Sequence, residues 1–154
     1  NEIDLISIVQ SVMDDFNNIY IEKRGIKIEL ITNNSKKDFK ILGIENRIEQ
    51  ILANLLDNAI SFSKDKQKII VEVEKNQNDQ VILRVIDQGQ GFKEKKLNKI
   101  FDRFYSDRPD KFGEHSGLGL NIVKNLVELH GGNIFASNNP DQGGARIEIA
   151  FPKV

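Results

Sequence analysis

Residues 44–62 read IENRIEQILANLLDNAISF, and this stretch decides the fold class. Its apolar residues recur every three or four positions, which predicts an amphipathic helix packed on a core. Asn54 and Asn58 interrupt the helical pattern within NLLDNA and share one helix face. Asparagine is a poor helix former because its side chain competes for nearby backbone groups, so the pair costs helix stability and calls for an explanation. The predicted buried stripe consists of Ile44, Ile48, Ile51, Leu52, Leu55, Ala59 and Phe62, with Asn54, Asn58 and Ser61 on another flank.

The rest of the chain alternates between helical and extended patterns. Further helices are predicted over 3–20, ending near Asn17 and Asn18, over a short piece at 93–100, and over 117–130, where Gly131 and Gly132 stop it. Strands are predicted at 26–30, 38–43, 68–75, 80–87, 133–137 and 144–151. This order predicts an α+β fold, a two-layer sandwich whose mixed sheet is covered on one face by about three helices. The chain, 1–154, is expected to form one domain.

Composition excludes several classes of function. The chain has 22 Lys and Arg against 23 Asp and Glu, a formal net charge of -1, so no broad field favours nucleic acid or an anionic membrane surface. The chain contains no cysteine, which excludes disulfides, thiolate metal sites and thiol nucleophiles. Only His115 and His130 can supply an imidazole. No apolar run approaches the roughly 20 residues that a membrane span needs, so the chain is expected to be soluble.

The segment 87–92, DQGQGF, follows a predicted strand and places an aspartate beside two glycines. One interpretation is a tight turn that begins with an Asx motif. The other is a nucleotide contact, in which Asp87 accepts a hydrogen bond from the amine of adenine while Gly89 and Gly91 let a flat ring approach the backbone. Guanine carries an acceptor at that position and would be repelled.

A second glycine pair, Gly117 and Gly119, opens the helix predicted after a polar loop at 105–116. It is either a flexible helix start or a phosphate site, because helix N-termini present free N–H groups and a partial positive charge. The sequence has no GxxxxGK[ST] motif, and GLGLNI lacks the third glycine of a Rossmann fingerprint. The Asn54 and Asn58 amides either bond within the fold or offer neutral oxygen ligands to Mg²⁺, which takes few protein ligands. Together these motifs favour a nucleotide site.

Four of these segments, taken in order, resemble the N, G1, F and G2 boxes of bacterial sensor histidine kinases. They are NLLDNA at 54–59, DQGQGF at 87–92, IFDRFY at 100–105 and SGLGL at 116–120, and the resemblance covers essentially the whole chain. The resemblance implies the Bergerat ATP-binding sandwich of gyrase, mismatch-repair and heat-shock chaperone ATPases. It also implies ATP and Mg²⁺ as cofactors.

Site residues carried over from the resemblance fall into three groups. Asn58 is implied as the Mg²⁺ ligand, and Asn54, Arg103 and Arg108 as residues near the reacting phosphate. Asn54 stands where the ATPase relatives carry a glutamate that activates water, so slow hydrolysis is expected. The implied nucleotide contacts are Asn58, Ser61, Phe62, Asp87, Gly89, Gly91, Tyr105, His115, Ser116, Gly117, Leu118, Gly119 and Leu120, with residues 105–116 forming the ATP lid.

Departures from the family pattern lie at four positions. Ser61 stands where members often have a lysine toward phosphate, and His115 replaces the first glycine of the G2 box. Ser106 stands where many members have an arginine, and Arg146 where a hydroxyl residue often assists adenine. These substitutions predict a weaker affinity for nucleotide.

The resemblance further implies an enzyme that transfers the γ-phosphate of ATP to a histidine on a separate helical dimerisation domain, for relay to an aspartate of a response regulator. No histidine followed by an acidic residue occurs here, so the phosphoacceptor is expected outside this chain. The implied protein is a homodimer anchored in the membrane, with this part cytoplasmic and monomeric alone. Two alternatives stay open: an ATP-hydrolysing conformational machine, which Asn54 disfavours, and a degenerate nucleotide-binding or docking module.

Overall fold

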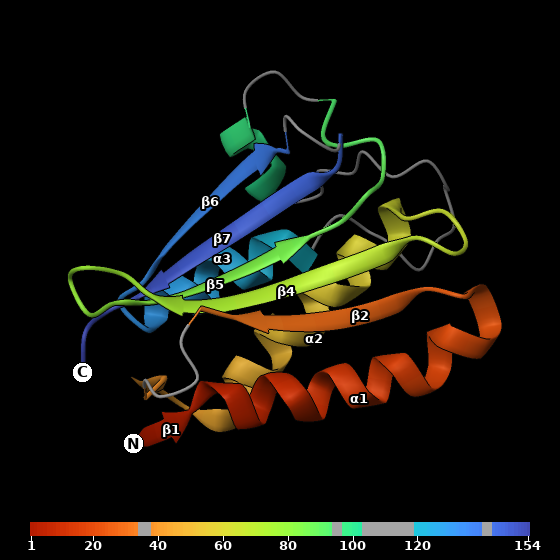
Figure 1. The fold of residues 1–154 in the computed structure, drawn as a ribbon. Helices are drawn as coiled ribbons and strands as arrows, with labels where there is room; N and C mark the ends of the chain where they lie inside the picture. Colours follow the sequence, from red (N-terminus) through yellow and green to blue (C-terminus); the bar gives the residue numbers. More distant parts are fainter. Residues whose placement is uncertain (34–37, 94–96, 103–118, 140–142) are drawn as a thin grey trace.

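A five-stranded mixed sheet forms one layer of the molecule (Figure 1). The computed structural model describes residues 1–33, 38–93, 97–102, 119–139 and 143–154. The strand order is β2-β4-β5-β7-β6; β2 pairs with β4 in parallel and every other pair is antiparallel. The strands are β2 (Lys27–Thr32), β4 (Lys68–Lys75), β5 (Val81–Ile86), β6 (Asn133–Asn138) and β7 (Ala145–Phe151).

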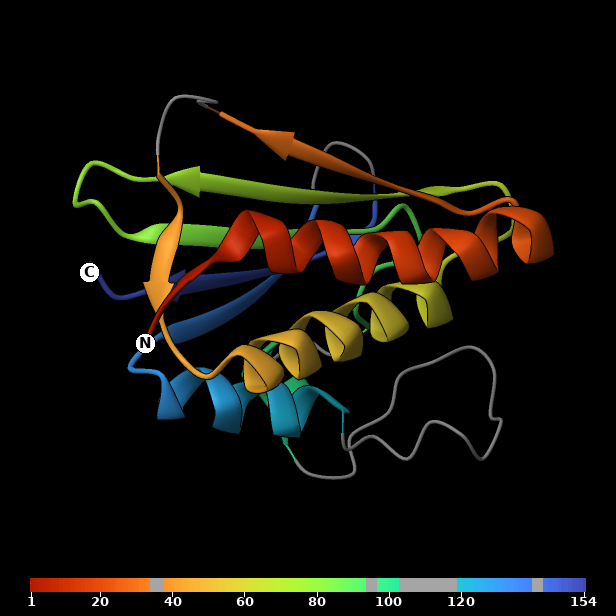
Figure 2. The same cartoon turned by 90° about the horizontal axis from the view of Figure 1, so that it is seen from below.

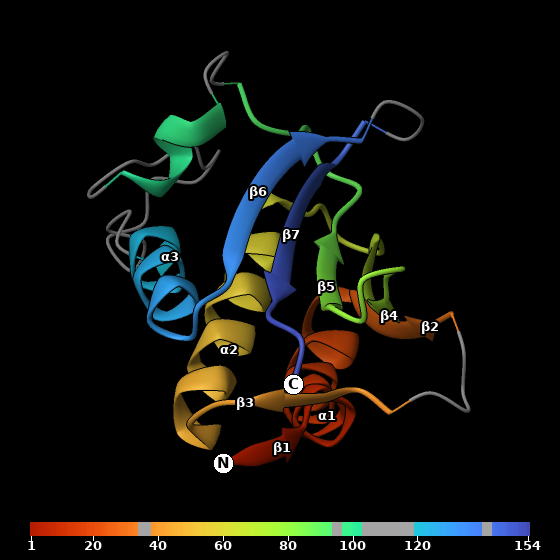
Figure 3. The ribbon, with the colours of Figure 1, turned by 90° about the vertical axis from the view of Figure 1, so that its left-hand side faces the viewer.

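Three helices lie on one face of this sheet and form the second layer (Figures 2 and 3). They are α1 (Leu5–Arg24), α2 (Glu45–Phe62) and α3 (Gly119–Leu129), and α2 packs between the other two. The α+β sandwich predicted from the sequence is therefore confirmed. Within the described residues, none of the helices is long and apolar enough to cross a membrane.

The core fills the space between the helices and the sheet. Alternate residues of each central strand point to the helices because side chains in a strand alternate between its two faces. Val71, Leu83 and Ile149 are fully buried in this way. Ile51, Leu52 and Leu56 of α2 belong to the same buried cluster. The same alternation sends the intervening residues of β4, β5 and β7 to the other face of the sheet.

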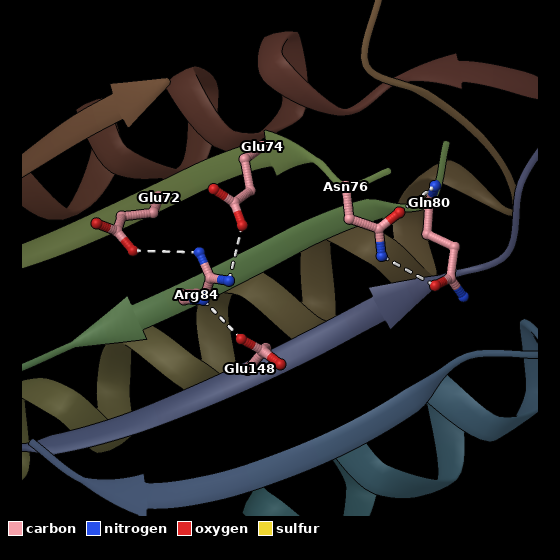
Figure 4. A network of polar contacts seen from close by, with 6 residues as sticks. All are labelled: Glu72, Glu74, Asn76, Gln80, Arg84 and Glu148. Atoms are coloured by element: carbon pink, nitrogen blue, oxygen red, sulfur yellow. Dashed lines mark hydrogen bonds and ion pairs between the residues drawn. The ribbon is translucent and has the colours of Figure 1, made fainter. Parts of the chain in front are cut away.

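A charged network covers that other face (Figure 4). Arg84 on β5 donates to Glu148 on β7 at 2.6 Å and to Glu74 on β4 at 2.7 Å, and it forms an ion pair with Glu72 at 3.5 Å. Burial alone would lower the pKa of Arg84. The hydrogen bonds and charges of Glu74 and Glu148 have the opposite and larger effect, so the pKa of Arg84 lies above its ordinary value. The permanent charge of Arg84 thus ties three neighbouring strands together.

The strands predicted at 68–75 and 80–87 are confirmed as β4 and β5, which pair antiparallel as a hairpin. Asn76 closes the turn because its Oδ1 accepts from the backbone N–H groups of Asn78 at 3.0 Å and Gln80 at 2.9 Å. Its amide nitrogen donates to Gln80 Oε1 at 3.0 Å (Figure 4). The Asn76 side chain therefore adds hydrogen bonds to the backbone bonds of the turn, as an Asx motif does.

Several predicted boundaries are wrong. Helix α1 continues past Asn17 and Asn18 to Arg24 and ends at Gly25, which adopts a left-handed φ of 67°. Asn17 does not stop the helix because its side chain bonds both backbone groups of Ile28, at 2.9 and 3.1 Å. The helical piece predicted at 93–100 is a short 3-10 turn, Leu97–Phe101. The loop predicted at 105–116 lies outside the described residues.

A small two-stranded sheet near the N-terminus was only half predicted. The strand β3 (Lys40–Leu42) matches the extended piece expected at 38–43, but its partner β1 (Glu2–Asp4) falls in the predicted first helix. Helix α1 begins after Asp4, whose carboxylate accepts from the backbone N–H of Ile6 at 3.1 Å. This cap explains the late start of the helix.

A histidine that directly follows α3, His130, accepts a hydrogen bond at the N-terminus of α2. Ile44, predicted as buried, is the N-cap residue of α2, is 54% exposed and has no side-chain cap bond. Instead its backbone N–H donates to His130 Nε2 at 3.2 Å, and His130 Nδ1 lies 2.7 Å from the carbonyl oxygen of Leu126. Since Nε2 accepts, Nδ1 carries the hydrogen. His130 therefore has a structural role at the end of α3.

Candidate functional site

Asp87 lies at the end of β5 and opens the glycine loop, residues 87–92. It is 3% exposed, and its Oδ1 accepts from the backbone N–H groups of Gly89 at 2.9 Å and Ala145 at 3.1 Å. Oδ2 accepts no bond from any residue that the structure describes. Within the same residues no completely buried side-chain oxygen lacks a partner, so Oδ2 is not completely buried. One oxygen is thus fixed by the fold and the other can accept a further hydrogen bond.

Burial raises the pKa of Asp87 above its ordinary value, and the backbone hydrogen bonds from Ala145 and Gly89 oppose that rise. The charged carboxylate is therefore held at a cost in solvation. A polar donor that reaches Oδ2 would recover part of that cost. The arrangement suits an acceptor for an exocyclic amine.

Two glycines around Asp87 are required by the packing of the protein itself. A Cβ at Gly89 would overlap the backbone carbonyl oxygen of Phe62 at the end of α2. A Cβ at Gly144, which precedes β7, would overlap the carbonyl oxygen of Asp87. Both glycines allow backbone segments from α2, β5 and β7 to meet at the aspartate. This close packing lets the N–H groups of Gly89 and Ala145 reach Oδ1 of Asp87.

Gly91 and Asn138 close the other end of the glycine loop. Gly91 has a left-handed φ of 79°, which side chains rarely adopt. Asn138, the last residue of β6, accepts from the backbone N–H of Phe92 at 2.7 Å and donates to the Phe92 carbonyl oxygen at 3.1 Å. The glycine loop is therefore anchored to strands β5 and β6 at its two ends.

Phe62, predicted as a nucleotide contact, packs against Phe92 of the glycine loop. Its ring is 4% exposed and meets the ring of Phe92 edge to face, with centroids 5.7 Å apart. The pair joins the end of α2 to the end of the glycine loop. Contact between Phe62 and a nucleotide stays a prediction.

The asparagine pair lies on α2 toward α3. Asn54 is half-buried, and its amide nitrogen donates to the carbonyl oxygen of Gly119 at 3.5 Å, which links α2 to the first residue of α3. Asn58, one turn later, is 4% exposed, and Ser61 Oγ donates to its carbonyl oxygen at 2.6 Å. The structure thus links Asn54 of the N box to the start of α3.

The predicted site divides into described and undescribed residues. Asp87, Gly89 and Gly91 lie at one end of the sandwich, and Asn54, Asn58, Ser61, Phe62, Gly119 and Leu120 lie on or beside α2. Arg146 does not join them: its Nε donates to Ser137 at 3.1 Å on the sheet face away from the helices. The predicted residues Arg103, Tyr105, Arg108, His115, Ser116, Gly117 and Leu118 lie outside the described residues.

Sequence reasoning missed three residues that position the glycine loop. Gly144 and Ala145 contact Asp87 through backbone packing and a backbone hydrogen bond, and Asn138 bonds both backbone groups of Phe92 at the other end of the loop. The sequence has a double glycine at 143–144, where the predicted last strand begins. Their sequence distance from Asp87 concealed the contact.

Residues 43–154 match the sequence profile of a family described as histidine kinase-, DNA gyrase B-, and HSP90-like ATPase. The chain belongs to this ATPase family. Over 97% of its length the chain is 34% identical to the sensor protein ChvG of Agrobacterium fabrum, of which it spans 27%. The resemblance of the sequence to sensor histidine kinases is therefore confirmed.

Solved structures of this ATPase family share the whole fold. The catalytic domain of the histidine kinase ThkA has a TM-score of 0.84 and 28% identity, covering 99% of this chain and 95% of that chain. ThkA in complex with the response regulator protein TrrA has a TM-score of 0.81 and 26% identity, covering 100% of this chain and 42% of that chain. The chain therefore has about the length of the ThkA catalytic domain, and it spans about a quarter of the length of ChvG.

The residues present fit the ligand that the ATPase family implies. Asp87 Oδ2 offers an acceptor for the amine of adenine. A Cβ at Gly119 would meet no described atom within 4 Å, so no described side chain or backbone segment packs closely against this glycine at the start of α3. Asn58 supplies an amide of the kind that Mg²⁺ accepts beside phosphate oxygens. No cluster of three or more His, Cys, Asp or Glu side chains is placed to hold a metal within the described part of the chain.

Proposed function

We propose that this chain is the ATP-binding catalytic part of a two-component sensor kinase. It binds Mg-ATP and catalyses transfer of the γ-phosphate to a histidine of a separate helical dimerisation domain, from which a response regulator aspartate receives it. The observation that carries the proposal is Asp87, which is fixed through Oδ1 and open at Oδ2. An acceptor in this state selects adenine over guanine.

The protein's own residues would divide the work of binding and positioning. Asp87 and the glycine loop would orient the base, and Asn58 would hold the Mg²⁺ that neutralises charge on the phosphates. The backbone at Gly119 would approach the phosphates from the start of α3, where helix N–H groups favour anions. In the reaction the bond from the γ-phosphorus to the bridging oxygen of ADP breaks, and a bond to the imidazole nitrogen forms.

Asn54 supports a kinase over an ATP-hydrolysing machine. An amide cannot take a proton from water, so it cannot act as the general base of hydrolysis. Its contact with the Gly119 carbonyl instead ties the N box to the start of α3. Phosphoryl transfer relies mostly on positioning and charge stabilisation, which this arrangement can supply without a base.

Partners and location follow from the same proposal. ThkA is seen in complex with the response regulator TrrA, and we extend that kind of partner to this chain. The chain spans 27% of ChvG, so the phosphoacceptor domain would belong to another part of the full protein. The part described here would lie in the cytoplasm, where ATP is present, and the full protein would be a membrane-anchored homodimer.

The direct test is phosphotransfer between separate domains. The chain is mixed with the helical phosphoacceptor domain of the same kinase and γ-labelled ATP. An acid-labile phosphoprotein is expected. At limiting ATP, Asp87→Asn should form it about 10- to 100-fold more slowly, and Asn133→Ala, a surface change at the start of β6, should match the wild type. A folded, ATP-binding chain that yields no phosphoprotein at any concentration would overturn the kinase proposal, and rapid steady-state hydrolysis would favour the ATPase machine instead.

A further inference from the structure

A pocket of about 530 Å³ opens at the C-terminal end of α2, beside the glycine loop. The C-terminal ends of α1 and α2 lie together at this side of the molecule (Figure 2). Ser61 and Phe62 line it from α2, and Gln90 lines it from the glycine loop. Since these residues belong to the two nucleotide motifs, the pocket adjoins the proposed nucleotide site. Its remaining lining residues are Arg24, Ser63, Lys64 and Asp65.

The two cationic residues of this pocket differ in what their charge contacts. Arg24 is fully engaged: it donates to Asp65 at 2.8 Å, to the Ile60 carbonyl at 3.2 Å and to the Ser63 carbonyl at 2.7 Å. Its charge therefore stabilises the negative end of the α2 dipole. The ammonium of Lys64 has no ion pair or hydrogen bond with any residue that the structure describes. Lys64 thus supplies the uncompensated positive charge of the pocket.

The backbone that carries Lys64 is fixed to the glycine loop. Its N–H donates to Gln67 Oε1 at 2.8 Å, and Gln67 Nε2 donates to the carbonyl oxygen of Gln88 at 3.0 Å. Gln88 Oε1 in turn accepts from the N–H of Lys68 at 2.8 Å. The turn after α2 and the glycine loop therefore form one bonded unit, which places Lys64 before any ligand arrives.

We propose that Lys64 is the cation that contacts the phosphate groups of the bound nucleotide from this pocket. The proposal rests on the proposed function, because it assumes that a nucleotide occupies the adjoining site. It assigns to Lys64 the charge that many family members carry at the position of Ser61. Ser61 cannot supply it because its hydroxyl is neutral, and that hydroxyl already donates to the Asn58 carbonyl at 2.6 Å.

The test compares two lysines on one turn. Lys64→Gln and Lys66→Gln each remove one exposed positive charge, but Lys66 does not line the pocket. Affinities for a non-hydrolysable ATP analogue, ADP and adenosine are measured by calorimetry. Lys64→Gln should weaken both nucleotides by about two- to fivefold and leave adenosine unchanged, as one exposed ion pair predicts. Lys66→Gln should match the wild type, and Lys64→Arg should restore binding.

A second variant moves the charge to the family position. In Ser61→Lys the new cation should take over the contact, so that Lys64→Gln costs less in this background than in the wild type. An equal loss for adenosine, or equal effects of the two glutamine variants, would reject the contact by Lys64 and leave the proposed function standing. Failure of the folded wild type to bind any of the three ligands would contradict the proposed function and this proposal together.

Discussion

The two ends of the candidate site use glycine for different reasons. At the Asp87 end, a Cβ on Gly89 or Gly144 would overlap backbone atoms of the protein itself. At the α3 end, a Cβ on Gly119 would meet no described atom within 4 Å. Packing therefore requires the first two glycines whether or not a ligand binds. Packing against the described residues does not require Gly119.

The same contrast appears in the polar groups. Asp87 is held by two backbone N–H groups at 2.9 and 3.1 Å, whereas Asn54 reaches Gly119 through one bond at 3.5 Å. The carboxylate of Asp87 is thus fixed by two short hydrogen bonds, whereas the described hydrogen bond between Asn54 and the start of α3 is longer. Preorganised acceptors lose little on binding, while an open helix start can adapt to phosphates and metal.

The largest expected effect is a loss of stability on substitution of Gly144, which packs against the backbone of Asp87. Gly144→Ala should lower the free energy of unfolding by about 3 kcal/mol, because its methyl group would overlap the Asp87 backbone. The measurement is urea unfolding beside the matched variant Gly143→Ala. Gly143 has a φ of 79° and an open surrounding, so alanine there should cost only about 1 kcal/mol. Equal losses in the two variants would show that Gly144 is not packed as described.

The next effect is on affinity. Asp87→Asn keeps the size of the side chain but loses the charge, and its NH₂ group can face the adenine amine, so affinity for ATP should fall about 10- to 100-fold. Calorimetry with ATP and adenosine measures the loss, which should be similar for both because it concerns the base. A variant that binds ATP like the wild type would exclude Asp87 as the acceptor.

Stability should respond to pH through the same residue. The folded pKa of Asp87 is raised, so the folded protein holds this proton more tightly than the unfolded chain. Stability from this carboxyl is fully present below its unfolded pKa, about 3.9, and is lost as pH rises through the folded pKa. Asp87→Asn should therefore gain stability relative to the wild type as the pH rises above the unfolded pKa. Urea unfolding of both at each pH measures this difference, and a constant difference would contradict the shift.

The smallest expected effect sharpens the contrast at the open end. Gly119→Ala should leave the free energy of unfolding unchanged or raise it by up to about 1 kcal/mol, because alanine favours a helix. The same variant should weaken ATP more than adenosine if phosphates approach this backbone. Thermal unfolding and calorimetry measure the two effects. A destabilised Gly119→Ala would show that packing requires this glycine too.

Sequence patterns predicted what local periodicity determines. The α2 helix, the β4–β5 hairpin and the last hairpin follow from apolar spacing and turn residues, and Asp87 and the asparagine pair follow from their motifs. Contacts between distant segments were not predictable. Gly144 lies 57 positions after Asp87, Asn17 bonds to Ile28 across a turn, and His130 caps a helix 86 residues away. Tertiary packing overrides local preference at these positions, as the continuation of α1 past its asparagines shows.

The most direct measurement is calorimetric binding of a non-hydrolysable ATP analogue with and without Mg²⁺, on the wild type, Asn58→Ala and the control Asn133→Ala. The wild type and the control should bind with a clear dependence on Mg²⁺. Asn58→Ala should lose that dependence while it still binds adenosine, which shows that the site is folded. A folded wild type that binds no ATP analogue, or an Asn58→Ala variant with unchanged Mg²⁺ dependence, would contradict a nucleotide site clamped by metal on α2.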